Sequence, residues 1–259
     1  MREWLSGGAS PCQGEGRGFE SRFALLFFAR RLISGLFLRG AQTMLMEKER
    51  RALVDYGNRM FADGLVTLTS GNISAYDPET GYMAITPSGI PYAETKPEDI
   101  VIMTLDGKIV DGARKPSSEN QLHAAVYRVR KDAGAVVHTH STFATVLGIA
   151  GQKVESVHFL LPNVMGRGDV PLLPYVTYGT KELADEVGKA MAYTPAVLLQ
   201  NHGMVACGSS LEDAYTRASA VETTAELQWR AECIGKPRLL TEEEVKDTYQ
   251  SYSTKYGQQ

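Results

Sequence analysis

The dipeptide Asp106-Gly107 joins two short apolar segments, and this feature most restricts how the chain can fold. Asp-Gly between such segments is a strong signal for a tight β-hairpin, so residues 100–105 and 108–110 are expected to pair as antiparallel strands. Further short strands are predicted at residues 72–76, 82–85, 135–138, 154–159, 195–199 and 204–207. The hairpin therefore indicates a sheet that is at least partly antiparallel.

Helix signals alternate with these strands. Residues 47–63 have apolar side chains near helical spacing and stop at Gly64, and Ser118 with Gln121 forms a capping-box pattern for a helix that runs to about residue 130. Further helices are predicted at residues 143–149, 181–191 after a cap at Thr180, 211–234, and from a cap at residues 241–244 onward. Helices mixed with hairpins favour an α/β fold with helices on both faces of the sheet.

Residues 1–43 differ from the rest of the chain. They contain six arginines and three glutamates, and arginines interrupt both of their apolar patches, so the segment is neither a signal-peptide core nor a membrane span. We expect it to be disordered, or an artefact of a start codon assigned upstream of Met44 or Met46. Residues 44–259 are then expected to form the single folded domain.

Composition excludes several classes of protein. Across 259 residues, 27 Lys and Arg against 30 Asp and Glu give a net charge of −3, which carries no global signal for binding nucleic acid or an anionic membrane. No apolar run reaches the roughly 18 residues that a membrane-spanning helix needs. Three cysteines without paired spacing exclude a disulfide scaffold and favour a reducing compartment, the cytoplasm.

The histidines give the first chemical signal. His138 and His140 end a buried strand, where alternation places both rings on one side, and His202 lies in a turn directly after another strand. Three imidazoles on one metal leave a coordination position open, as in catalytic zinc sites. The same spacing also fits a hydrogen-bonded pair without a metal. His123 is expected to pack or to support the site from inside a helix, and His158 lacks a partner at suitable spacing.

Three short turns rich in small polar residues give the second signal. They cover residues 69–72, 86–89 and 116–119, and the third lies at a predicted helix N-terminus, which favours a bound anion. Together they could hold a phosphate with neutral donors, although Ser and Gly are also ordinary turn residues. Glu119 in the third turn could cap the helix, bind the metal or act as a general base.

Five segments in order along the chain carry a resemblance to a known family. They are Ser-Gly-Asn-Ile-Ser (70–74), Ile-Thr-Pro-Ser-Gly-Ile-Pro-Tyr (85–92), Lys-Pro-Ser-Ser-Glu (115–119), Val-Val-His-Thr-His (136–140) and Gln-Asn-His-Gly (200–203). Together they resemble the class II aldolase/adducin family over residues 46–259, most closely its L-fuculose 1-phosphate aldolases. The resemblance implies a three-layer α/β/α domain with a largely antiparallel central sheet, and a C4-symmetric homotetramer with active sites at subunit interfaces.

The resemblance also implies roles for individual residues. It implies one Zn²⁺ per subunit, with Mn²⁺ or Co²⁺ as alternatives, and assigns as ligands His138, His140, His202 and, in the resting state, Glu119. It implies phosphate contacts from Gly71, Asn72, Ser88, Gly89, Ser117 and Ser118. Glu119, once released from the metal, is the implied base, and Tyr256 the implied catalytic tyrosine. The implied reaction is reversible cleavage of a ketose 1-phosphate, of the L-fuculose 1-phosphate type, into dihydroxyacetone phosphate and a small aldehyde such as lactaldehyde.

One departure from the family pattern opens an alternative substrate. Phe159 follows His158 where aldolases that act on fuculose phosphate commonly have a tyrosine, so a 5-deoxyribulose or methylthioribulose 1-phosphate aldolase is the alternative. Glu119 stands where the L-ribulose-5-phosphate 4-epimerases usually carry aspartate, which favours an aldolase. A non-catalytic adducin-like scaffold would not need a complete ligand set, and a three-histidine zinc hydrolase would not need three donor turns.

Overall fold

The structure is a computed structural model that describes residues 44–255, so the expectations for residues 1–43 and for Tyr256 lie outside the described residues. Its strands are β1 (Asn72–Asp77), β2 (Tyr82–Ile85), β3 (Val101–Thr104), β4 (Ile109–Asp111), β5 (Ala135–Thr139), β6 (Leu172–Leu173), β7 (Ala196–Leu199) and β8 (Gly203–Gly208). They form one sheet in the order β4-β3-β2-β1-β5-β8-β7-β6. All neighbours are antiparallel except β6 and β7, so the predicted, largely antiparallel sheet is confirmed.

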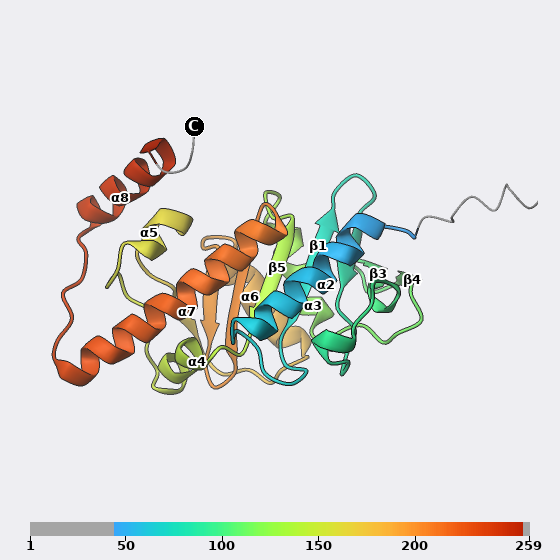
Figure 1. Ribbon diagram of the computed structural model, residues 1–259, viewed down its shortest axis with the longest axis horizontal. Coiled ribbons are helices and arrows are strands. Elements are labelled where there is room, and N and C mark those ends of the chain that lie inside the picture. Colours follow the sequence, from blue (N-terminus) through green and yellow to red (C-terminus); the bar gives the residue numbers. More distant parts are fainter. Residues whose placement is uncertain (1–43, 256–259) are drawn as a thin grey trace, which may run out of the picture. The chain divides into compact units, whose positions relative to one another are not determined.

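Helices cover both faces of this sheet (Figure 1). They are α2 (Glu47–Ala62), α3 (Asn120–Val129), α4 (Thr142–Ile149), α5 (Leu160–Met165), α6 (Lys181–Met191), α7 (Leu211–Ile234) and α8 (Glu242–Lys255), with short 3-10 turns at η1 (Tyr92–Glu94) and η2 (Pro97–Asp99). One buried cluster joins the sheet to α2, α4 and α7, and a second joins it to α3 and α6. The three-layer α/β/α architecture is therefore confirmed. None of the helices within residues 44–255 is both long and apolar enough to cross a membrane.

Local signals placed most helix ends correctly. Thr180 Oγ1 accepts a hydrogen bond from the Leu183 backbone N–H at 3.2 Å, as expected of a helix N-cap. Thr241 and Glu244 exchange two such bonds, since each side chain accepts from the other's backbone N–H. At the end of α2 the chain turns at Gly64, whose φ of +72° suits glycine.

Two sequence-based expectations are wrong. Ser118 does not cap a helix: α3 begins at Asn120, with Glu119 in the N-cap position, and it is Ser117 Oγ that accepts from the Glu119 backbone N–H at 3.2 Å. Residues 154–159 do not form a strand. Only Val154 makes an isolated β-bridge, while the Glu155 N–H donates to the side chain of Gln228 in α7 at 2.8 Å. Contacts made by α7 replace the strand pairing that the sequence pattern suggested.

The three central strands bring distant parts of the chain to one end of the sheet. Asn72 at the start of β1 is paired with His138 near the end of β5, and Thr139 is paired with Met204 at the start of β8. Because neighbouring strands are antiparallel, the loop before β1, the end of β5 and the turn before β8 meet there. The candidate site lies at this end.

Candidate metal centre

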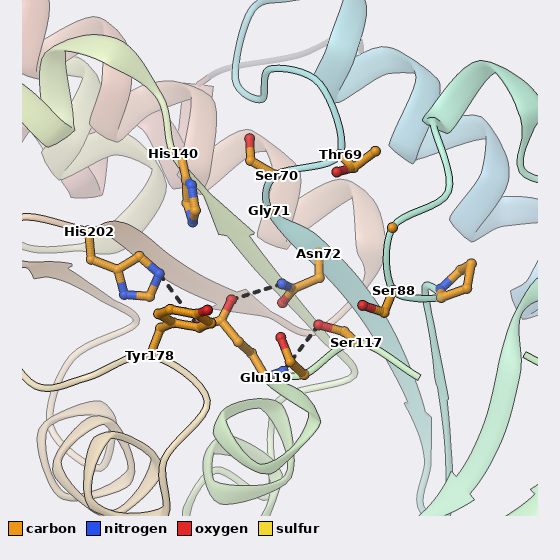
Figure 2. Close-up of a pocket in the computed structure, with 13 residues that line it drawn as sticks. Thr69, Ser70, Gly71, Asn72, Ser88, Ser117, Glu119, His140, Tyr178 and His202 are labelled. Carbon is orange, nitrogen blue, oxygen red and sulfur yellow. Dashed lines mark hydrogen bonds and ion pairs between the residues drawn. The ribbon is translucent and has the colours of Figure 1, made fainter. Parts of the chain in front are cut away.

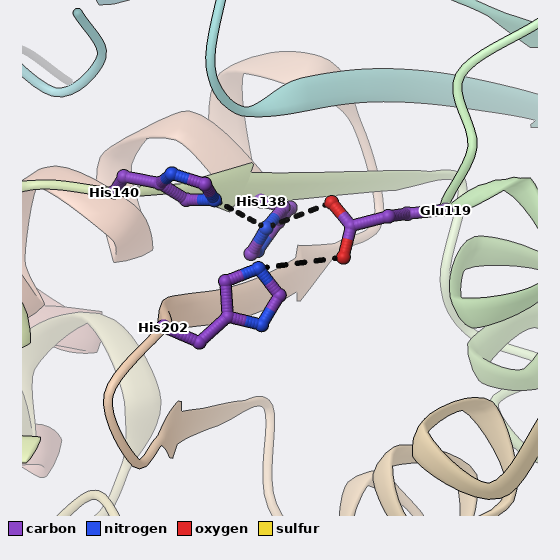
Figure 3. Close-up of side chains that lie close together, drawn as sticks. All are labelled: Glu119, His138, His140 and His202. Carbon is purple, nitrogen blue, oxygen red and sulfur yellow. Dashed lines mark hydrogen bonds and ion pairs between the residues drawn. The ribbon is translucent and has the colours of Figure 1, made fainter. Parts of the chain in front are cut away.

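Four side chains from three parts of the chain converge on one point (Figure 3). Glu119, His138, His140 and His202 each offer one ligand atom, and these atoms lie within 4.8 Å of one another. His138 Nε2 is 3.1 Å from Glu119 Oε2 and 3.0 Å from His140 Nε2. His202 Nε2 is 3.4 Å from Glu119 Oε1. The three histidines and the glutamate that the sequence analysis assigned to one metal site are brought together by the fold.

Strand alternation and a tight turn place the three imidazoles. His138 lies in β5 and His140 follows two residues later, so both side chains leave the same face of the sheet. His202 lies in the β7–β8 turn, where Asn201 has a φ of +55°, a conformation that asparagine tolerates. Gly203 lets this turn approach β5, because a Cβ there would lie 2.1 Å from the Thr139 carbonyl oxygen.

Hydrogen-bond chemistry shows that the centre of this cluster suits a cation. His138 Nδ1 faces the carbonyl oxygen of Met204 at 2.9 Å and must donate to it, so the lone pair of Nε2 points into the cluster. In the cluster this lone pair faces Nε2 of His140 and the carboxylate of Glu119, and a carboxylate can only accept hydrogen bonds. Glu119 Oε1 and His202 Nδ1 are buried without a hydrogen-bond partner among the described residues. Three imidazoles and one carboxylate fit a divalent transition metal such as zinc.

The electrostatics of three of the four side chains, His140, His202 and Glu119, agree with this fit. Burial, together with the neighbouring His138, lowers the pKa of His140 to about 3 and that of His202 to about 4, so both rings are neutral at pH 7 and keep a lone pair for a metal. Burial alone would lower the pKa of His138, but the charge of Glu119 raises it above its ordinary value. Burial would raise the pKa of Glu119, but His138 and Asn72 hold it well below its ordinary value, so the carboxylate is ionised.

A pocket of about 250 Å³ opens beside the cluster (Figure 2). Its lining includes Glu119, His140 and His202 together with all six residues that the sequence analysis assigned to a phosphate, namely Gly71, Asn72, Ser88, Gly89, Ser117 and Ser118. Among the described residues that line it there is no lysine or arginine. Any anion in this pocket would therefore be bound by hydroxyl, amide and backbone N–H groups beside the metal centre.

Backbone pairing holds the turn at residues 86–89 and the turn at residues 116–119 together. Residues Pro87 and Pro116 form an isolated antiparallel bridge, and the Ser117 N–H donates to the Thr86 carbonyl oxygen at 3.1 Å. The turn at residues 69–72 packs directly on β5. Its backbone approaches so closely at Gly71 that a Cβ there would lie 2.7 Å from the His138 carbonyl oxygen. The histidines and the small donors are therefore parts of one packed unit.

The sequence analysis did not assign Tyr178 to the site, although this residue lines the pocket. Tyr178 is exposed and lies in the loop between β6 and α6, which passes close to Ser118: a Cβ on Gly179 would lie 3.5 Å from the Ser118 carbonyl oxygen. The available signal was the sequence Tyr-Gly-Thr at 178–180, directly before a capped helix. Without the fold, nothing in that signal placed the loop near the other turns.

The two remaining histidines do not join the metal ligands. His123 is fully buried and is hydrogen-bonded to Asn72 and Ser74, which confirms the expectation of a supporting or packing role. His158 lies in the turn before α5, where its Nδ1 accepts from the Leu160 N–H at 3.3 Å. Phe159 is half exposed and is not among the residues that line the pocket of its own chain.

Comparison with known proteins agrees with the fold and the cluster. A family model described as the class II aldolase and adducin N-terminal domain matches residues 51–229. The chain belongs to the class II aldolase/adducin family. With this membership, the cluster of three histidines and one glutamate identifies a class II aldolase, a metal-dependent aldehyde-lyase that acts on a sugar phosphate.

Several members of this family are similar along most of their length. A 5-deoxy-D-ribulose 1-phosphate aldolase of Bacillus thuringiensis is 43% identical over 216 residues, which cover 83% of this chain and 100% of the relative. A 5-methylthioribulose-1-phosphate/5-deoxyribulose-1-phosphate aldolase of Rhodospirillum rubrum is 37% identical over 80% of this chain and 92% of the relative. The solved structure of an L-fuculose 1-phosphate aldolase has a TM-score of 0.78 and 38% identity, and covers 82% of this chain and 100% of that one.

Proposed function

We propose that this aldolase cleaves 5-deoxyribulose 1-phosphate, or its 5-methylthio analogue, into dihydroxyacetone phosphate and a short aldehyde with an apolar end. The observation that carries the proposal is the 43% identity to the Bacillus thuringiensis enzyme over that relative's whole length, above the 38% identity to the fuculose 1-phosphate aldolase. Phe159, in place of a tyrosine, supports it, since a phenyl ring offers apolar surface and no hydroxyl. This assignment reverses the order of preference that the sequence motifs suggested.

The three donor turns would hold the phosphate of the substrate. Ser88, Ser117, Ser118 and Asn72 all line the pocket, and Ser117 and Ser118 directly precede the N-terminal end of α3. Backbone N–H groups at a helix N-terminus and small hydroxyls bind anions without a charged side chain. A fixed phosphate would place the ketone and the C3–C4 bond of the substrate next to the metal centre.

Glu119 would move the proton at C3. It is the one acid among the described residues that line the pocket, and it is ionised. In the cleavage direction the C4 hydroxyl loses its proton, the C3–C4 bond breaks, and the electron pair stays with the three-carbon fragment as an enediolate. The ionised Glu119 carboxylate takes up, by way of solvent, the proton that the C4 hydroxyl released, and delivers it to C3, which completes dihydroxyacetone phosphate. A divalent metal held by the three histidines would polarise the C2 ketone and stabilise the negative charge.

The remaining parts of the proposal concern the assembly and the metal. We propose Zn²⁺ as the metal, residues 44–259 as the aldolase unit, and a homotetramer in which Phe159 and Tyr256 reach the site of a neighbouring subunit. Tyr256 would then exchange the proton of the C4 hydroxyl. The family resemblance supports these parts, and the half-exposed Phe159 side chain agrees with a contact outside its own chain.

A substrate panel tests the proposal. Release of dihydroxyacetone phosphate, measured by coupled reduction, is compared for 5-deoxyribulose 1-phosphate, methylthioribulose 1-phosphate and fuculose 1-phosphate, and epimerisation of ribulose 5-phosphate is followed separately. We expect the two substrates with an apolar C5 end to have the highest kcat/KM. A higher kcat/KM for fuculose 1-phosphate would instead support the second candidate, which the 38% identity to a fuculose 1-phosphate aldolase favours.

A further inference from the structure

A continuous row of buried polar side chains runs behind the pocket and ends at Glu119. The hydroxyl oxygens of Tyr127 and Ser74 are 2.7 Å apart, and Ser74 Oγ is 2.7 Å from His123 Nδ1. His123 Nε2 is 2.5 Å from Asn72 Oδ1, and Asn72 Nδ2 is 3.0 Å from Glu119 Oε2. All five residues are buried, and Ser74 and His123 have 0% exposure, so the polar groups of these two depend on their neighbours in the row rather than on solvent.

The position of every proton in this row follows from the carboxylate. A carboxylate only accepts, so Asn72 must turn its Nδ2 toward Glu119 and its Oδ1 toward His123. The His123 ring must then carry its proton on Nε2 and accept at Nδ1, which makes Ser74 the donor to the ring. Burial lowers the pKa of His123 to about 3, so the ring is neutral and one tautomer is defined. Tyr127, finally, donates to Ser74.

This order of donors fixes which way the Asn72 amide faces. If the amide were reversed, its oxygen would lie against the Glu119 carboxylate and its NH₂ group against the N–H of His123, so both contacts would be repulsive. In the observed orientation one N–H of Asn72 holds Glu119. The second N–H is left for the pocket, which Asn72 also lines.

We propose that His123 is a positioning residue, which acts through Asn72 to place both the Glu119 carboxylate and an amide donor for the substrate phosphate. The proposal rests on the proposed function, since it takes Glu119 and Asn72 as the proton-moving and phosphate-binding groups. It explains why a polar ring occupies a site with 0% exposure, where an apolar side chain would avoid the cost of burial. It also gives Ser74 a role, namely to hold the His123 tautomer.

Two conservative variants separate positioning from packing. His123→Gln keeps an N–H at about the reach of Nε2 and can still donate to Asn72, whereas the shorter His123→Asn reaches only toward Ser74. Both are polar and neutral, so a general effect on the fold should be similar in the two. We expect His123→Asn to lose about 10- to 100-fold in kcat/KM, with a raised KM and a lowered kcat, and His123→Gln to stay within a few-fold of the wild type. Equal losses in the two variants would overturn the proposal.

A third substitution, Thr224→Val, provides a matched control. Thr224 is fully buried and its hydroxyl has no hydrogen-bond partner among the described residues, so this near-isosteric change removes a buried polar atom outside the row. We expect unchanged turnover and unchanged metal affinity. Ser74→Ala, in contrast, removes the donor to Nδ1 and should cost nearly as much activity as His123→Asn.

Two readouts do not depend on the substrate assignment. Long-range ¹H–¹⁵N correlation spectra of the metal-loaded protein should show His123 with its proton on Nε2, and Ser74→Ala should weaken this preference. Titration of the metal-free protein with Co²⁺ should show weaker binding in His123→Asn than in His123→Gln. A proton on Nδ1 in the wild type, or equal Co²⁺ affinities, would refute the positioning role even if the proposed reaction is correct. If these readouts agree while no ketose 1-phosphate is cleaved, the proposed function fails and the positioning of Glu119 stands.

Discussion

The two walls of the pocket are built on different physical principles. On the histidine wall, His140 and His202 line the pocket, and the fully buried His138 completes the cluster, in which the three imidazoles point at one another. On the donor wall, the turns at residues 69–72, 86–89 and 116–118 present small polar groups that have few side-chain partners (Figure 2). The histidine wall would bind its ligand, a metal, through a few atoms, whereas the donor wall would bind an anion through many hydrogen-bond donors.

This difference predicts how each wall responds to substitution. A metal site depends on the number of its ligands, so the loss of one imidazole affects the whole centre. Anion binding by several neutral donors loses only one hydrogen bond at a time, about 1.5–3 kcal/mol when the partner is charged. Each substitution on the histidine wall should therefore strongly weaken the whole metal site. Each substitution on the donor wall should weaken anion binding moderately and independently of the others.

Removal of the metal should have the largest effect. We expect prolonged chelation to abolish turnover and added Zn²⁺ or Co²⁺ to restore it. His202→Ala should lose most of the bound metal and more than about 100-fold in activity, a larger loss than is typical for residues that only support metal ligands. Metal content by elemental analysis and turnover are measured on the same samples. Full metal occupancy in His202→Ala would contradict the assignment of the histidine wall.

Glu119→Gln should lower turnover by about 10²- to 10⁴-fold, the usual contribution of a general acid or base. Glutamine keeps the shape of the side chain, and three imidazoles remain, so the protein should still bind metal and unfold at a similar temperature. Asn72 can keep its orientation and donate to the amide oxygen of the new glutamine, which limits secondary damage. Activity within a few-fold of the wild type would contradict the proposed role of Glu119 in proton transfer.

The histidine wall was predictable from sequence, because its signals are local. His-x-His on a strand places two rings on one face whatever the rest of the chain does, and a histidine in a tight turn between two strands is held next to them. The donor wall was recognised only when its three turns were taken together with a family resemblance, since Ser and Gly occur in most turns. Tyr178 was missed because its approach to Ser118 depends entirely on tertiary packing.

The errors in the predicted fold also arise from tertiary contacts that local sequence signals do not reveal. Residues 154–159 have the composition of a strand, but Glu155 is bonded to Gln228 and Ser156 accepts from the Leu240 N–H at 2.8 Å, so distant segments take the backbone partners. The helix that begins at Leu160 had a usable signal, because Pro162 lies in its first turn, where proline is tolerated. Tertiary contacts outweighed local preference here, whereas the Asp106-Gly107 hairpin needed no distant partner.

Ser88→Ala tests the donor wall. Loss of one hydroxyl should raise KM for the ketose 1-phosphate by roughly tenfold, while kcat, metal content and stability change little. Ser209→Ala is a matched control, because Ser209 is exposed, is not among the residues that line this pocket, and donates its hydroxyl hydrogen to Asp213 Oδ2 at 3.1 Å. The control should leave KM nearly unchanged. A large fall in kcat or in bound metal for Ser88→Ala would show that the two walls are not separable.

Phe159→Tyr should have the smallest effect and should change selectivity rather than rate. Phe159 belongs to neither wall of its own chain and is 53% exposed, so in the proposed tetramer it contributes only to the aldehyde end of a neighbouring site. A tyrosine adds one neutral hydroxyl, and a neutral hydrogen bond contributes about 0.5–1.5 kcal/mol. We therefore expect kcat/KM for fuculose 1-phosphate to rise roughly two- to tenfold relative to that for 5-deoxyribulose 1-phosphate. Only the aldehyde released from fuculose 1-phosphate has a hydroxyl to which the tyrosine hydroxyl can hydrogen-bond. Tyr193→Phe, which removes a hydroxyl from a side chain that is 87% exposed, is the control and should leave this ratio unchanged. An unchanged ratio in Phe159→Tyr would remove the structural support for an apolar aldehyde, and the substrate assignment would then rest on sequence identity alone.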